Sequence, residues 1–320
     1  MQNWLSLAAL AGFVFIIYFN FDKFRDPETI LKVTEKLKNV SGLWWKLTII
    51  LVLVFINYFI EAIKWRQLVS GLENISIMVS MKSVLIGLLF ALFTPARLGE
   101  IGGRIIVLNK PNRWQGVASL LAGSLSQNLA IIIAGCGAMI YFLYQPVQLS
   151  GILTSSISIG TTLLLILGLV IYFNMQWFFS AMKKRIRAGK IATFIHQFDI
   201  VANYSRLDLM YILILSLLRI LVWTALYLLL FQLIFDVSVN LDFLMAVFLI
   251  FLFQTAIPLP LVTGFLARGG VAIIVWQYFG VSEWVALLTT FSLYFINLLL
   301  PALVGLFVLM LNKDETKENE

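Results

Sequence analysis

The chain has 320 residues, of which 61% are hydrophobic and 12% are charged, and its formal net charge is +7. Its mean hydropathy of +0.96 excludes a water-soluble globule, because soluble domains carry about twice this fraction of charged residues. The apolar runs lack the every-second-residue alternation of a membrane β-barrel. We therefore expect an all-α polytopic membrane protein, whose positive charge reflects basic cytoplasmic loops and not a nucleic-acid partner.

Six apolar runs are long enough to cross a bilayer, which takes about 20 helical residues. In chain order they are 4–21, 44–63, 116–144, 151–173, 209–235 and 284–311. The first has neither the positive charge nor the small-residue cleavage pattern of a secretory signal, so we expect it to be retained as a helix.

Two further apolar regions, 83–108 and 243–279, are interrupted. The first contains Thr-Pro-Ala-Arg-Leu-Gly-Glu at 94–100, and the second contains Pro-Leu-Pro at 258–260. Proline lacks an amide donor and glycine exposes backbone, so both break helices, and broken backbone at membrane depth survives only against protein or a wet cavity. We predict a re-entrant helical hairpin in each region.

The order of these elements repeats along the chain. Two spans, a hairpin and one span fill residues 1–144 and again residues 145–311, before a polar tail at 312–320. Three spans per unit is an odd number, so the second unit should be inverted relative to the first, as in secondary transporters that bind substrate between inverted repeats. The basic loop 174–208 is predicted to be cytoplasmic. The side of the amino terminus stays open, because this arrangement leaves another basic loop outside.

Three charges in the first interrupted region share one helix face. Arg97, Glu100 and Arg104 are spaced three and four apart, and Glu100 precedes Arg104 in the favourable order for an ion pair. Gly99 and Gly103 would let another helix approach closely beside them. Either Glu100 orients one arginine while the other faces an anion, or the pair only closes the hairpin.

Arg219 lies deep in an apolar run, where an arginine costs about 2.5 to 3.5 kcal/mol on insertion scales and should face a partner or a cavity. We expect Arg268, in the second hairpin, to be its neighbour. Arginine stays charged and can grip phosphate with two parallel hydrogen bonds. The alternative is that Arg219 pairs with Glu61 or Glu100 only to hold helices together.

Several amide side chains also lie at span depth. We expect only Gln127 and Asn128 to line a cavity, whereas Asn57, Gln254 and Asn297 join helices. Lys64, Trp65 and Arg66 are expected in an aromatic and basic belt at the membrane interface, a position that could also attract anionic headgroups.

Catalytic chemistry has little support in the sequence. Cys136 and His196 are the single cysteine and the single histidine, so we expect no disulfide, metal cluster, cofactor or catalytic pair. An arginine-rich cavity instead predicts an anionic lipid headgroup, and phospholipids and isoprenoid phosphates fit equally well. The predicted binding residues are Glu61, Arg97, Glu100, Arg104, Gln127, Asn128, Arg219 and Arg268.

The 94–100 stretch, followed by Arg104 and Leu108, resembles the flippase-like family of lysylphosphatidylglycerol synthase transmembrane regions. That family includes the membrane half of the bacterial multiple peptide resistance factor. Its proline, arginine, Gly-Glu and later arginine fall on Pro95, Arg97, Gly99, Glu100 and Arg104. The resemblance implies a multi-pass flippase-like protein of the bacterial inner membrane. It implies no synthase activity, because no soluble aminoacyl-transfer domain follows the last span.

The second hairpin departs from the family pattern. Family members often have Pro-x-Pro-Gly-Gly followed by a glutamate, whereas here Pro-Leu-Pro leads to Arg268-Gly269-Gly270. Losing an acid and gaining an arginine means that the resemblance does not extend to the family's usual substrate.

Three functions fit these observations. The leading hypothesis is a lipid translocator that binds a phosphate-bearing headgroup between inverted halves. The second is an enzyme that transfers a group to or from a lipid-linked substrate, for which Glu61 and Glu100 form the only plausible pair of acids. The third is a non-transporting accessory subunit that uses the basic loop 183–190.

Overall fold

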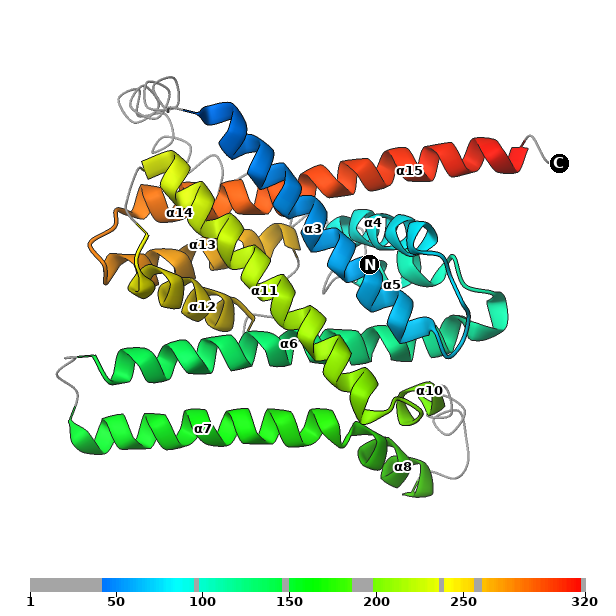
Figure 1. Ribbon diagram of the computed structural model, residues 1–320, viewed down its shortest axis with the longest axis horizontal. Coiled ribbons are helices and arrows are strands. Elements are labelled where there is room, and N and C mark those ends of the chain that lie inside the picture. Colours follow the sequence, from blue (N-terminus) through cyan, green and yellow to red (C-terminus); the bar gives the residue numbers. More distant parts are fainter. Residues whose placement is uncertain are drawn as a thin grey trace, which may run out of the picture.

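The structure, a computed structural model, describes residues 42–94, 98–145, 150–185, 198–235, 239–255 and 261–317. All regular structure in these ranges is helical (Figure 1). The main helices are α3 (Leu43–Val69), α4 (Ile77–Phe93), α5 (Leu98–Ile105), α6 (Arg113–Leu143), α7 (Gly151–Phe173), α8 (Met175–Arg185), α11 (Arg206–Phe235), α12 (Leu241–Thr255), α13 (Leu261–Gln277), α14 (Glu283–Tyr294) and α15 (Leu300–Lys317). Shorter elements are η2 (Lys110–Asn112), α10 (Asp199–Ala202) and the π-helical turn η3 (Phe295–Leu299).

Five helical segments in the described part of the chain are long and apolar enough to cross a membrane. They coincide with the predicted runs 44–63, 116–144, 151–173, 209–235 and 284–311, the last formed by α14, η3 and α15 together. The prediction of an all-α multi-pass membrane protein is confirmed. The sixth predicted run, 4–21, lies outside the described residues.

The first interrupted region folds as two short helices, α4 and α5, that pack against each other. Thr94 is the C-cap residue of α4, and its hydroxyl accepts a hydrogen bond from the amide of Gly99 at 2.7 Å. A β-carbon added at Gly103 would meet the backbone of Gly87, and one added at Gly99 would meet that of Phe90. The helices therefore run antiparallel with their backbones in direct contact.

The second interrupted region also consists of two short helices, α12 and α13, in contact with each other. Gln254, near the end of α12, donates a hydrogen bond to the backbone carbonyl of Arg268 in α13 at 3.1 Å. The Pro-Leu-Pro stretch at 258–260 lies outside the described residues. Like α4, α12 is shorter than the roughly 20 residues that a span requires.

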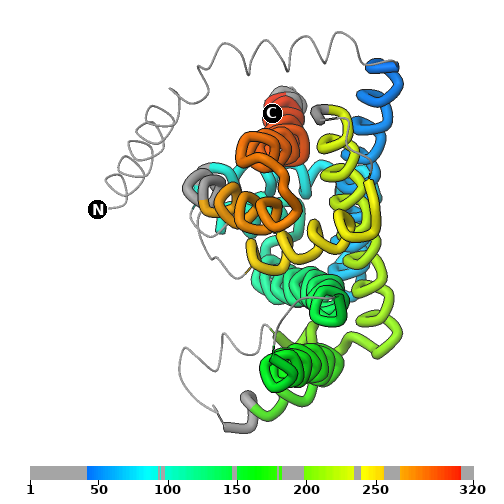
Figure 2. The backbone as a smooth tube through the Cα atoms, turned by 90° about the vertical axis from the view of Figure 1, so that its left-hand side faces the viewer, coloured from blue at the N-terminus to red at the C-terminus, as the bar shows by residue number. Residues whose placement is uncertain are grey.

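Each pair of short helices packs on a long helix from the other half of the chain. α4 contacts α15, and α12 contacts α6, while α3 and α11 contact each other and lie side by side in Figure 1. α7 lies at the edge of the bundle against α6 (Figure 2). Only 11% of the apolar stretch of α7 is buried within the protein. The centre of the bundle is thus built from both halves.

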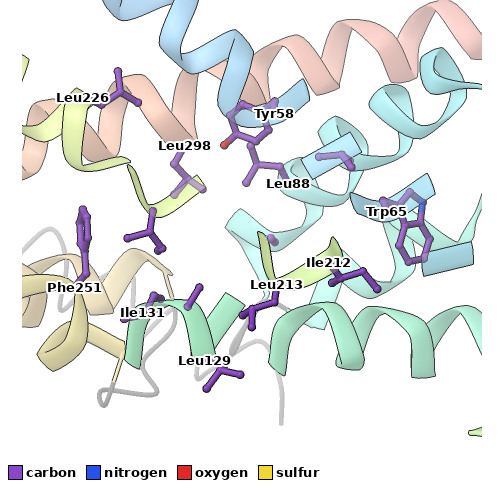
Figure 3. Packing of buried hydrophobic residues seen from close by; sticks show 14 of the residues in the cluster. Tyr58, Trp65, Leu88, Leu129, Ile131, Ile212, Leu213, Leu226, Phe251 and Leu298 are labelled. Atoms are coloured by element: carbon purple, nitrogen blue, oxygen red, sulfur yellow. The ribbon is translucent and has the colours of Figure 1, made fainter. Parts of the chain in front are cut away.

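Apolar and aromatic side chains fill most of this centre. Figure 3 shows Tyr58 of α3, Leu88 of α4 and Leu298 of η3 converging from three elements. The rings of Phe231 and Trp276 stack at 4.6 Å, and the Trp276 indole donates to the Tyr227 hydroxyl at 2.9 Å. These contacts fix α13 against α11 beside the polar residues described next.

Candidate functional site

A cavity of about 330 Å³ opens where the short helices meet the long ones. One part of its wall is polar and charged, and another is apolar and aromatic. The polar residues are Asn57, Glu61, Glu100, Arg104, Gln127, Asn128, Arg219, Gln254, Thr255, Arg268, Thr290 and Asn297, and the others are Tyr58, Val84, Leu88, Ile131, Trp223, Phe251, Leu293, Tyr294 and Leu298.

Glu61 of α3 is the electrostatic centre of the wall. One carboxylate oxygen accepts from Arg104 at 2.7 Å, and the other contacts both Lys64, at 2.8 Å, and Arg219. The Glu61 residue is only 5% exposed, so its charge is screened mainly by these cations and not by water. A single carboxylate therefore joins cations from three helices.

Arg104 also contacts Glu100 one helical turn earlier in α5, which confirms the predicted pairing. Its guanidinium lies 5.9 Å from the centre of the Trp65 ring. The close backbone contact between α4 and α5 leaves Arg104 in the protein interior at 4% exposure. Arg97 lies outside the described residues.

Arg219 lies close to the middle of α11, and three neighbours besides Glu61 fix its orientation. Its Nε donates to Asn57 at 3.0 Å, its Nη1 donates to Gln127 at 3.1 Å, and it lies 4.9 Å from the centre of the Trp223 ring. The pairing of Arg219 with Glu61 that the sequence offered as an alternative is present. Arg268 lies in the wall of the same cavity.

Lys64 does not face the surface of the protein, as a residue of the expected interfacial belt would. Its residue is 2% exposed, and its ammonium contacts Glu61 and donates to Gln127 at 3.2 Å. α3 continues past the apolar run to Val69, and Lys64 follows Glu61 by three residues on the same helix face. Trp65 is also buried, whereas Arg66 is exposed.

The expectation for the amide side chains was incomplete. Gln127 and Asn128 line the cavity, but so do Asn57, Gln254 and Asn297. Asn57 accepts hydrogen bonds from Arg219 and from the Trp223 indole, the latter at 2.8 Å, and donates to Asn297 at 2.9 Å. The sequence did contain one signal that Asn57 lines the cavity, because Asn57 precedes Glu61 by four residues and so lies one helical turn before it on the same face of α3.

The last span changes its helical geometry beside the cavity. In the π-helical turn η3 the Leu300 amide donates to the carbonyl of Phe295, five residues earlier. Pro301 has no amide proton to donate to Asn297, four residues before it, and the Tyr58 hydroxyl bonds to that carbonyl instead. Asn297 thereby offers both its side chain and its backbone to α3.

Two donors of the cavity-lining residues are buried without a hydrogen-bond partner. They are Nε of Arg104 and Nε2 of Gln127. Buried polar groups are normally satisfied by protein, water or a ligand. Both atoms have almost no accessible surface, so they lie behind the cavity wall and not on it.

The structure places seven of the eight predicted binding residues in one cavity wall; the eighth, Arg97, is not described. Their role in binding stays a prediction. Within the described ranges, no group of three or more histidine, cysteine or acidic residues could hold a metal ion.

Membrane-length helices around a buried, ion-paired polar cavity define a multi-pass helical membrane protein with a polar site inside its bundle. The family model for the lysylphosphatidylglycerol synthase TM region matches residues 3–305, so the chain belongs to this family, as its 94–104 motif suggested. Neither the comparison with curated proteins nor that with solved structures found a match.

Proposed function

We propose that this protein translocates an anionic, phosphate-bearing lipid across the bacterial inner membrane. The headgroup would enter the cavity while the acyl or prenyl chain stays in the bilayer. The observation that carries the proposal is the charge of the cavity wall, in which three arginines accompany two glutamates. Permanent cations at membrane depth are costly and are found where an ion or substrate passes.

The proposed transport mechanism rests on two inverted halves, each made of two spans, a re-entrant hairpin and a third span. Support comes from the reciprocal packing, in which α4 contacts α15 and α12 contacts α6. Such an arrangement is expected of halves related by an axis in the membrane plane, with a substrate site between them. Rocking of one half against the other would expose the cavity alternately to the two leaflets.

We propose transport rather than group transfer because of the state of the two acids in the wall. Glu61 contacts three cations, and Glu100 contacts Arg104. A general base needs an oxygen within hydrogen-bond reach of the substrate proton, and both oxygens of Glu61 are already in contact with cations. These acids are suited to positioning arginines.

The test is lipid movement in proteoliposomes. Labelled lipids, one a phosphodiester and one a prenyl phosphate, are placed in both leaflets, and the outer label is quenched chemically. We expect the purified protein to expose label from the inner leaflet faster than empty liposomes do. Arg219→Lys keeps the charge but loses the forked geometry that binds Asn57 and Gln127, so it should slow the rate.

Arg66→Gln is the matched control, because Arg66 lies two residues from Lys64 on α3 but is exposed. It should translocate lipid at the rate of the unmodified protein. If neither labelled lipid moves faster than in empty liposomes, although the reconstituted protein is folded, the proposed function is wrong.

A further inference from the structure

The side-chain amide of Asn57 has its orientation fixed by two neighbours on α11. Its oxygen accepts hydrogen bonds from Nε of Arg219 at 3.0 Å and from the Trp223 indole at 2.8 Å. Guanidinium and indole nitrogens can only donate, so neither neighbour could bond to the nitrogen of the amide. Asn57 has no exposed surface. Its oxygen must therefore face α11, which leaves its nitrogen for the last span.

This orientation is passed on to Asn297. Nδ2 of Asn57 donates to the side-chain oxygen of Asn297 at 2.9 Å, and the Tyr58 hydroxyl bonds to the backbone carbonyl of Asn297. Both oxygens of Asn297 thus face α3. The oxygen and nitrogen of an amide are carried on opposite sides of one carbon, so Nδ2 of Asn297 is turned away from the oxygen that bonds to Asn57.

Nδ2 of Asn297 is an accessible donor. Asn297 lines the cavity and is partly exposed. Within the described part of the chain its Nδ2 has no hydrogen-bond partner, and unlike Nε2 of Gln127 it is not buried. Phe295, two residues earlier, is 55% exposed, and two helical residues turn by about 200°, so Asn297 faces the bundle.

We infer that Asn297 contacts the substrate and that its Nδ2 donates a hydrogen bond to an oxygen of the phosphate group in the cavity. Asn57 is then the positioning residue that fixes which side of the Asn297 amide the cavity receives. The inference rests on the proposed function and adds a neutral donor to the arginines of the wall. Free phosphate offers the same oxygens as a lipid headgroup, so the experiment separates the two sources.

The alternative role of Asn297 is to join the last span to α3 and nothing more. Asn297→Asp separates the two roles, because the side chains are nearly equal in size. The carboxylate still accepts from Asn57, which keeps the contact between helices, but the donor becomes a charged acceptor oxygen. When the added acid is protonated, its hydroxyl again supplies a donor beside an oxygen that accepts from Asn57.

The experiment measures binding of a labelled short-chain phosphodiester lipid to the full protein in a neutral detergent. At a pH of about 7.5 we expect Asn297→Asp to weaken binding at least about tenfold, the loss of one hydrogen bond to a charged group. Asn297→Leu loses the same donor without adding charge and should weaken binding less, by about threefold or more.

A series of decreasing pH gives a second readout. As the added acid takes up a proton, the affinity of Asn297→Asp relative to the unmodified protein should rise and pass that of Asn297→Leu, which should stay constant. The phosphodiester keeps its single charge throughout. The other titratable groups around the cavity are common to all three proteins, so their titration cancels in these ratios. They are Tyr58, Glu61 and Lys64 of α3, Glu100 and Arg104 of α5, Arg219 and Tyr227 of α11, Arg268 of α13 and Tyr294 of α14.

Asn240→Asp is the matched control. It adds the same charge at the exposed start of α12, where an aspartate oxygen can accept from the Phe243 amide as Asn240 does. It should bind the lipid as tightly as the unmodified protein.

If Asn297→Asp does not fold, Asn57→Asp decides. Its carboxylate still accepts from Arg219 and Trp223 but cannot donate, so Asn297 must turn its nitrogen towards α3 and its oxygen towards the cavity. This variant should weaken binding by about threefold or more, and an unchanged affinity would overturn the inference.

The outcomes separate this inference from the proposed function. Asn297 only joins helices if Asn297→Asp binds as tightly as the unmodified protein, or if Asn297→Leu binds as weakly as Asn297→Asp or more weakly at every pH. Either result overturns the inference and leaves lipid translocation standing.

The expected dependence on Asn297, without lipid movement in proteoliposomes, would keep the contact and contradict the proposed function. Displacement of the lipid by equal amounts of inorganic phosphate supports the contact but assigns it to soluble phosphate. Absence of lipid binding by the unmodified protein overturns the inference, whatever the rate of lipid movement.

Discussion

The hydroxyl of Tyr58 bonds to the backbone carbonyl of Asn297, the carbonyl that Pro301 leaves without its α-helical donor. The Tyr58 side chain of α3 therefore supplies the hydrogen-bond donor that Pro301 removes from the last span. The contact holds the π-helical turn η3 against the cavity, beside the bond between the side chains of Asn57 and Asn297.

The first prediction concerns this bond and the proline. Tyr58→Phe should destabilise the protein by about 1 kcal/mol, because the Asn297 carbonyl loses its donor. In a Pro301→Ala background the amide at 301 can bond to that carbonyl, so the same change should cost much less. Thermal unfolding in detergent, followed by tryptophan fluorescence, gives the coupling between the two sites.

Tyr278→Phe is the control for removing a tyrosine hydroxyl, because Tyr278 is 68% exposed. It should change the free energy of unfolding little in either background. If Tyr58→Phe lowered the free energy of unfolding equally with and without Pro301, the proline would not be the reason why the Asn297 carbonyl needs the Tyr58 donor.

The second prediction concerns the balance of charge at Glu61. Glu61→Gln leaves Lys64, Arg104 and Arg219 around a neutral amide and should destabilise the protein by about 3 to 5 kcal/mol. Adding Lys64→Met removes one cation with the lost anion and should recover part of that loss. Unfolding temperatures of the single and double variants measure the recovery.

Glu283→Gln provides the matched control at an exposed glutamate and should stay within about 0.5 kcal/mol of the unmodified protein. The electrostatic account of Glu61 would be wrong if the double variant were less stable than Glu61→Gln alone.

The third prediction compares two adjacent glycines of α5. A β-carbon at Gly103 would overlap the backbone of Gly87, whereas one at Gly102 meets nothing within 4 Å. Gly103→Ala should therefore cost about 1 to 3 kcal/mol by forcing α5 away from α4, and it should displace Arg104. Gly102→Ala should be neutral or stabilising by up to about 1 kcal/mol.

Unfolding temperature and the rate of lipid movement in proteoliposomes, measured on both variants, check this prediction. A Gly103→Ala protein that is as stable as Gly102→Ala would mean that α4 and α5 can separate without cost.

The long elements could be predicted because span length and helix breakers are local signals. The runs at 44–63 and 209–235 appear as α3 and α11, and the glycines at 99 and 103 mark the contact of α5 with α4. The pairing of Glu100 with Arg104 was also predictable, because both lie on one helical turn.

The rest of the site depends on contacts between distant segments. The bond of Asn57 to Asn297 joins residues 240 positions apart, and no local pattern distinguishes it from ordinary contacts between helices. Lys64 was expected at the surface because a lysine after an apolar run usually lies at the interface, whereas here α3 continues to Val69 and the Lys64 ammonium contacts Glu61 and Gln127 inside the bundle. The sequence could nominate the charged residues but not the single carboxylate that three of them share.

The contacts around Glu61 also form in a fixed order during biosynthesis. Glu61, Lys64, Glu100 and Arg104 are made first, carry two negative and two positive charges, and are joined by ion pairs. Arg219 emerges from the ribosome later and adds its contact to Glu61. The newborn first half can thus enter the bilayer with these four charges matched, before the second half arrives.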